Sequence, residues 1–290
     1  MSNPLRDQDW RVLLSRIAKG KVTPVIGDGA LDSVRIAQKW ARDYDYPLAD
    51  AANLPRVAQF VAVNQSDPLV PKEELLDLLR REPPLDPNAP NDIHNVLAAL
   101  PMPVYLTTNY DSLMTKALEA KNKRPRRELC RWNDALKSQP SVFDAAEGFE
   151  PDATNPLVYH LYGHDELPES LVLTEDDHLD YLVKVSVGNR LPPRIRRALA
   201  GTSLLFLGYS LDSLTFRVLF RGIIHSVEGK IPTLNVAVQM PPDSSAYMEY
   251  LKNYHEIFPD VQVRTTVYWG TLQEFARELD ERWRNFRDDQ

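Results

Sequence analysis

Four short polar clusters in this chain have the residue types needed for chemistry on a nucleotide, and each directly follows an apolar run. They are GDGA (27–30), NYD (109–111), YGHD (162–165) and GYSLD (208–212). Glycines let backbone N–H groups approach a phosphate, while amide, carboxylate and imidazole groups can orient a nucleophile or move a proton. In an open parallel sheet, the loops that follow the strands gather at one edge. The four clusters therefore predict one nucleotide-type site.

The first and last clusters also fit a plainer interpretation. Gly27 and Gly29 follow a predicted strand and precede a predicted helix, as in a pyrophosphate-binding turn, but an ordinary strand-to-helix turn has the same pattern. The carboxylate of Asp28 would repel a phosphate unless it points away. The glycine, serine and aspartate of the last cluster could bind ribose or phosphate, or simply form a turn.

The two middle clusters also leave alternatives open. Asn109 and Asp111 lie two residues apart and could cap the following helix, as single Asn or Asp residues often do. His160 and Tyr162 would share one strand face if the strand continues that far, and a histidine there could equally be a hydrogen-bonded core residue. His164 is expected in a solvated loop.

The elements that must position these clusters alternate between strand and helix patterns, which indicates an α/β fold. The expected strands are 22–26, 104–108, 157–161, 203–207, 232–239 and 261–268, with a further short strand at 170–173. The expected helices are 7–18, 32–43, 53–65, 73–81, 92–100, 112–120, 174–185, 192–200, 213–224, 244–257 and 271–286. Thr174 and Asp177 have the spacing of a capping box. We expect a Rossmann-like open, mostly parallel sheet with helices on both faces.

The domain organisation expected from this pattern is a single domain over residues 1–290. A helical insertion follows the first strand at about 31–100, and an irregular insertion occupies about 121–155. The chain length is sufficient for one large hydrophobic core.

The charge, the cysteine count and the apolar runs limit which partners we expect. The formal net charge is −7, which argues against binding nucleic acid through bulk positive charge. The basic stretches 121–127 and 190–197 lack interleaved aromatic residues, so nucleic acid is not an expected partner. One cysteine excludes an intramolecular disulfide or a multi-thiolate zinc site, and no metal is expected. With no apolar run of 18 residues and no signal peptide pattern, we expect no membrane partner and a cytoplasmic location.

The ordered motifs resemble the sirtuin fold. They are VIGDGA (25–30), YLTTNYDSL (105–113), VYHLYGHDELPESLVLTEDDHLDYL (158–182) and LLFLGYSLDSLTFR (204–217). The resemblance runs from about residue 10 to 285 and is closer to the divergent prokaryotic branch of NAD-hydrolysing domains used in anti-phage defence. The TTNYD and LGYSL motifs are its specific part.

The resemblance implies a set of site residues. Asn109 would position the nicotinamide ribose and the attacking water, and Asp111 would lie by the nicotinamide amide. The residues expected to contact NAD are Gly27, Asp28, Gly29, Ala30, Thr108, Tyr162, Gly208, Tyr209, Ser210 and Asp212. Asp28 replaces the family's usual alanine in the pyrophosphate turn.

Two departures from the family pattern change the expected chemistry. The four-cysteine zinc module of sirtuin deacylases is absent from the sequence, so protein deacylation is not expected. The family's catalytic histidine directly precedes a glycine, and here that position is Tyr162, before Gly163. A tyrosine with a pKa near 10 suits a base at neutral pH poorly, so His160, two residues earlier, is the candidate base.

The resemblance implies an NAD hydrolase that releases nicotinamide and ADP-ribose as a regulated anti-phage effector. Such a toxin would need a sensor region in a longer protein or a separate activator chain, and we expect a homo-oligomer. Two other functions remain open: a non-catalytic NAD- or ADP-ribose-binding or assembly module with the same fold, and ADP-ribosyl transfer to a protein or nucleic acid.

Overall fold

The computed structural model describes residues 5–27, 32–144, 148–187, 191–209, 216, 234–241, 244, 246–247, 249–250 and 265–288. Within these ranges, seven strands form one sheet in the order β3-β4-β2-β1-β5-β6-β7, and every pairing is parallel. The strands are β1 (Val22–Ile26), β2 (Val104–Thr107), β3 (Arg126–Leu129), β4 (Leu157–His160), β5 (Ser203–Leu207), β6 (Asn235–Gln239) and β7 (Thr265–Trp269). The predicted Rossmann-like α/β fold is confirmed.

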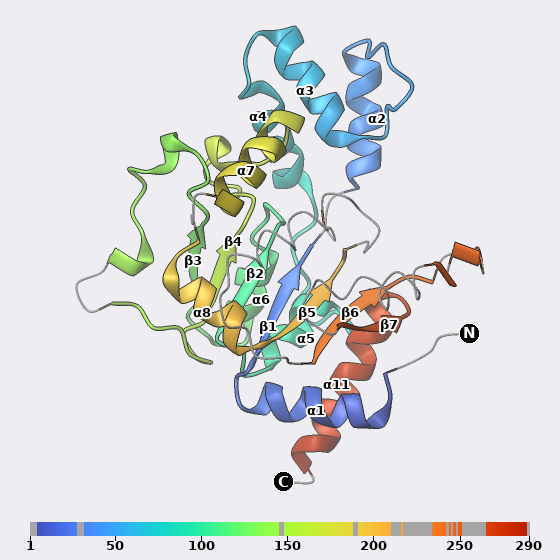
Figure 1. Cartoon of the computed structure of the whole chain (residues 1–290), viewed down its shortest axis with the longest axis vertical. Coiled ribbons are helices and arrows are strands. Elements are labelled where there is room, and N and C mark those ends of the chain that lie inside the picture. The colour runs from blue at the N-terminus through green and yellow to red at the C-terminus, as the bar shows by residue number, and fades with distance from the viewer. Residues whose placement is uncertain are drawn as a thin grey trace.

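The strand order reverses at β1. From β1 the chain places β2, β4 and β3 on one side, and then returns to place β5, β6 and β7 on the other side (Figure 1). β1 and β5 pair along their whole lengths, with Ile26 opposite Leu207 at the carboxyl end. This is the topological switch point, where open parallel sheets bind their ligands. We call the side on which the strands end the carboxyl edge.

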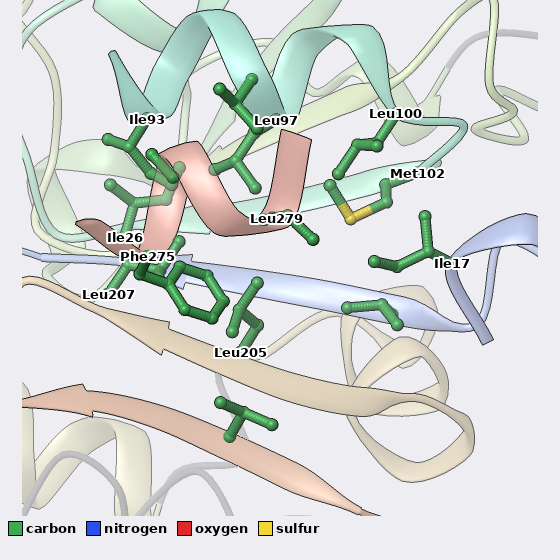
Figure 2. Packing of buried hydrophobic residues seen from close by; sticks show 14 of the residues in the cluster. Ile17, Ile26, Ile93, Leu97, Leu100, Met102, Leu205, Leu207, Phe275 and Leu279 are labelled. Carbon is green, nitrogen blue, oxygen red and sulfur yellow. The ribbon is translucent and has the colours of Figure 1, made fainter. Parts of the chain in front are cut away.

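Helices cover both faces of the sheet, as predicted. The helices are α1 (Asp7–Ala18), α2 (Ser33–Asp43), α3 (Leu54–Gln65), α4 (Val70–Arg81), α5 (Ile93–Ala99), α6 (Leu113–Ala120), α7 (Glu175–Val187), α8 (Pro193–Gly201) and α11 (Leu272–Asp288). One hydrophobic core joins α1, α5, α6 and α11 to the sheet, and a second core joins α7 and α8 to the opposite face. Figure 2 shows the first core, in which Leu97 and Phe275 extend from helices toward Ile26 and Leu205 on the strands.

The helices between β1 and β2 divide into two groups. α2, α3 and α4 share a separate core around Trp40, Val57 and Leu75, and they lie beyond the carboxyl edge (Figure 1). α5 packs into the main core instead, with Ile93 and Leu97 among its buried residues. Because α5 leads into β2, its first turn lies near the carboxyl edge.

Two expectations for individual segments were wrong. Residues 170–173 do not form a strand: a 3-10 turn covers Pro168–Ser170, and Leu171 and Leu173 then pack into the α2–α4 core. The segment 121–155 is not wholly irregular, because it contains β3, which pairs with β4 at the edge of the sheet. Pairing with a distant strand is what makes β3 extended, so its own sequence carries little signal for it.

The capping box at the start of α7 is confirmed. The backbone N–H of Asp177 donates to Thr174 Oγ1 at 3.1 Å, and the backbone N–H of Thr174 donates to Asp177 Oδ2 at 3.0 Å. The expected helices 213–224 and 244–257 lie largely outside the described residues. In the part of the chain that is described, no helix is both long enough and apolar enough to cross a membrane.

Candidate functional site

Backbone hydrogen bonds bring together the loops that follow β1, β2 and β5. The N–H of Gly27 donates to the carbonyl of Leu207 at 2.8 Å, and the N–H of Thr108 donates to the carbonyl of Ile26 at 2.9 Å. These bonds extend the parallel ladders one residue beyond the strands. Gly27, the TTNYD motif and the start of the GYSLD motif therefore adjoin at the switch point.

Tyr209 lies across this junction. Its hydroxyl donates to the carbonyl of Ile26 at 3.0 Å and lies 3.1 Å from Thr108 Oγ1. Its ring packs over Gly27 so closely that a Cβ placed on the glycine would lie 2.5 Å from two ring carbons. Gly208 has a φ of +75°, a conformation that favours glycine. The two glycines therefore allow the tyrosine to link the ends of β1 and β2.

Asn109 follows β2 and is held by its backbone. Its N–H donates to Thr107 Oγ1 at 2.9 Å, and its carbonyl lies 3.1 Å from His160 Nδ1. The side-chain Nδ2 is buried and has no hydrogen-bond partner among the described residues. A buried amide nitrogen costs free energy unless it is paired, so this atom is suited to binding a ligand oxygen.

His160, the last residue of β4, is buried and carries an available ring nitrogen. Because Nδ1 faces the carbonyl of Asn109, the neutral ring holds its proton on Nδ1 and leaves a lone pair on Nε2. Within the described part of the chain, Nε2 has no hydrogen-bond partner. The pKa of His160 is lowered well below 6.5, chiefly by burial and further by the positive charge of Arg127 and by His164. The ring is therefore neutral at pH 7, and the same burial makes it a weaker base than a free imidazole.

Asp111 forms a tight turn just before α6. Its Oδ1 accepts the backbone N–H of Leu113 at 2.9 Å, whereas the N-cap of the helix is Ser112, so Asp111 is not the cap itself. Its pKa is raised, mainly by burial, while the hydrogen bond from Leu113 and the charge of Arg127 act in the opposite direction.

Tyr162 packs against α7. β4 ends at His160, so the strand alternation that would align the two side chains stops there. Tyr162 is buried against Tyr181 and His178 of α7, with ring centroids 5.0 and 5.4 Å away. Burial raises its pKa, which makes ionisation at neutral pH still less favourable.

The structure adds two residues that the sequence did not single out. Arg127 of β3 forms ion pairs in the loop after β4, and buried His94 of α5 is close enough to Asp111 to influence its ionisation. Arg127 was visible only as one member of a basic run, and His94 only as a helical histidine. Neither pattern indicates where the side chain lies.

Five of the predicted site residues lie outside the described residues: Asp28, Gly29, Ala30, Ser210 and Asp212. The predicted contacts Gly27, Thr108, Gly208 and Tyr209 adjoin one another, whereas Tyr162 packs toward α7. In the described ranges no group of three or more His, Cys, Asp or Glu side chains could hold a metal ion.

An all-parallel open sheet with polar loops at its switch point defines a nucleotide-binding class of α/β protein. Within that class, the chain belongs to the SIR2-like domain family, whose profile matches residues 103–258. This result confirms the resemblance to a divergent sirtuin-like branch. The matched region begins just before β2 and therefore includes the Asn109, His160 and Tyr209 positions.

Curated relatives support the same branch. The chain is 35% identical over 121 residues to NAD(+) hydrolase ThsA of Bacillus cereus (strain MSX-D12), covering 40% of this chain and 21% of that protein. It is 26% identical over 125 residues to NAD(+) hydrolase ThsA of Acinetobacter baumannii (strain 532279), covering 42% of this chain and 22% of that protein. The match thus spans about a fifth of each relative's length.

Proposed function

We propose that this chain hydrolyses NAD to nicotinamide and ADP-ribose. The observation that carries the proposal is the pairing of Asn109 with His160 at the carboxyl edge. Each has a buried side-chain nitrogen without a hydrogen-bond partner among the described residues: Nδ2 of Asn109, and Nε2 of His160. The Nε2 atom of the neutral imidazole carries a lone pair. The relatives named as NAD(+) hydrolases support the same activity.

The proposed reaction breaks the bond between the ribose C1′ and the nicotinamide nitrogen. That bond's electron pair leaves with nicotinamide, which departs as a neutral pyridine and needs no strong general acid. A water oxygen then bonds to C1′, and the water gives up one proton. His160 Nε2 is the proposed acceptor of that proton, and the Asn109 amide orients the ribose and the water.

The glycine turn and Tyr209 support the proposed binding mode. Gly27 lies at the switch point beneath the Tyr209 ring, and Tyr209 and Thr108 place neighbouring hydroxyl groups at the edge where a pyrophosphate or ribose would bind. Asp111 is proposed to face the nicotinamide amide, whose N–H groups its carboxylate can accept.

The regulation of such an activity is also part of the proposal. We propose a cytoplasmic anti-phage effector that forms a homo-oligomer and is controlled by a sensor region or activator chain, because unrestrained loss of NAD would harm the host cell. Mass measurement of the purified chain in solution, with and without NAD, tests the oligomer. A monomer under both conditions would contradict that part of the proposal.

The test of the activity is release of nicotinamide from NAD by the purified chain. Asn109→Ala should abolish release, and His160→Ala should reduce it by about 10²- to 10⁴-fold, the usual range for loss of a general base. Asn155→Ala is the matched control, since Asn155 precedes β4 and lies at the opposite edge of the sheet. Label from NAD that becomes attached to a protein or nucleic acid would instead indicate ADP-ribosyl transfer.

A second function is supported by two tyrosines. Tyr162 occupies the position of the family's histidine, and the Tyr209 ring covers Gly27. Both features fit a module that binds NAD or ADP-ribose without turnover. Binding of NAD by calorimetry, with no nicotinamide released at high protein concentration, would favour this function over hydrolysis.

A further inference from the structure

One arginine of the basic stretch 121–127 lies inside the protein. Lys121, Arg124 and Arg126 are exposed, as expected for a solvated face. Arg127 is different, because only 17% of its side chain is exposed. On β3 it lies opposite Val158 of β4, two residues before His160, and its side chain reaches the loop that follows β4.

Arg127 connects the loop after β4 to the loop after β2. Its two terminal nitrogens pair with Asp165 Oδ1 at 2.6 Å and with Glu166 Oε1 at 2.9 Å. The backbone N–H of Asp165 in turn donates to the carbonyl of Tyr110 at 2.8 Å. Tyr110 lies between Asn109 and Asp111, so the arginine is two bonded steps away from the NYD turn.

We propose that Arg127 is a positioning residue of the site, which holds the loop after β4 against the NYD turn and supplies the positive charge that faces His160. It acts through Asp165 and Tyr110 and touches none of the reacting atoms. The part of this inference that concerns enzymatic activity rests on the proposed function. Its structural part stands on the ion pairs and the bond from Asp165 to Tyr110.

The charge of Arg127 acts on both histidines near the site. It is the second cause, after burial, of the lowered pKa of His160 and also of His164, whose ring lies 5.6 Å from that of His160. His160 is also faced by His164, which lowers its pKa further, and by the backbone of Asn109 and of Gly163, which raise it.

His164 has acidic neighbours as well. Asp165, Glu166 and Glu128 each act to raise its pKa, against burial and Arg127. Removing the arginine charge therefore shifts both histidines toward protonation.

The test uses Arg127→Gln, with Arg56→Gln as the matched control. Arg56 also bridges two carboxylates, Asp50 at 2.7 Å and Glu175 at 2.9 Å. It belongs to α3 and pairs with α7, and 46% of its side chain is exposed. Both variants thus lose a doubly paired arginine, and only one of them loses a charge that faces His160. Hydrogen exchange and histidine titration by NMR are measured on the whole chain, followed by nicotinamide release as a function of pH.

We expect the amide of Asp165 to exchange about tenfold faster in Arg127→Gln, because the loop that carries it is released. His160 should begin to protonate at a higher pH than in the unmodified chain, and the acid side of the activity profile should move the same way. Arg56→Gln should leave all three unchanged. Unchanged Asp165 exchange and His160 titration in Arg127→Gln, or equal changes in the control, would overturn the inference.

Arg127→Lys separates the two parts of the role and also covers a failure of Arg127→Gln to fold. Lysine keeps the charge but not the paired hydrogen bonds of the guanidinium. Asp165 exchange should accelerate while the His160 titration stays near that of the unmodified chain. A changed titration with unchanged exchange would contradict the proposal. If no nicotinamide is released by any form, the proposed function fails, and exchange and titration still decide the role of Arg127.

Discussion

The contact between Gly27 and Tyr209 allows a stringent test of the site geometry. An alanine Cβ at position 27 would lie 2.5 Å from two Tyr209 ring carbons and 2.7 Å from a third. Real Cβ atoms are not found so close to other heavy atoms, so the ring must move. Gly27 does not have a positive φ, and any cost of the substitution therefore arises from this overlap alone.

The size of the effect follows from what holds the ring. Displacing Tyr209 breaks its hydroxyl bonds to Ile26 and Thr108, at about 1 kcal/mol each, and overpacking adds about 1–3 kcal/mol. Gly27→Ala should therefore lower the free energy of unfolding by about 3–5 kcal/mol. Urea denaturation followed by circular dichroism measures this difference directly.

A double-mutant cycle tests the stated cause. In the Tyr209→Ala background the ring is absent, so adding Gly27→Ala should cost little, with a coupling close to the full cost in the unmodified chain. Gly201→Ala is the control, because no described atom beyond its own helix and chain neighbours lies within 4 Å of its added Cβ, and it should be neutral or stabilise α8 by up to about 1 kcal/mol. The reasoning is refuted if Gly27→Ala costs the same with and without the Tyr209 ring.

Two other predictions concern the loop after β4 and the buried histidine. Gly163 has a φ of +87° and packs directly on the backbone of Ser170, which cannot rotate away, so Gly163→Ala should destabilise the chain by about 3 kcal/mol or more in urea denaturation. A loss below about 1 kcal/mol would contradict that packing. The folded-state pKa of His160 is lowered, so below pH 6.5 the unfolded state binds a proton that the folded state does not. The free energy of unfolding therefore decreases as the pH is lowered, by at most about 1.4 kcal/mol per pH unit. His160→Gln should reduce this slope between pH 6.5 and 5, and an unchanged slope would show that the folded protein protonates the ring freely.

Much of the fold is predictable because its signals are local. The runs VTPVI and SLLFL form β1 and β5 with the predicted bounds, since central parallel strands are buried on both faces and read as continuous apolar segments. The predicted helix 7–18 matches α1, whose buried residues recur at helical spacing. The convergence of the loops after β1, β2 and β5 follows from the parallel order of the strands.

The parts that could not be predicted depend on contacts distant in sequence. β3 is short and charged, and it is extended because it pairs with β4. Arg127 looks like its exposed neighbours until the loop after β4 folds over it. The different surroundings of His160 and Tyr162 depend on where β4 ends, because residues two apart share a face only while the strand continues.

Nicotinamide release from NAD, measured for the purified chain and for Asn109→Ala at equal folded concentration, tests the central proposal most directly. The account predicts release by the unmodified chain, retained in the Asn155→Ala control and lost in Asn109→Ala. Equal release with and without the Asn109 amide would contradict the assigned site, and neither release nor NAD binding by the unmodified chain would contradict the proposed function itself.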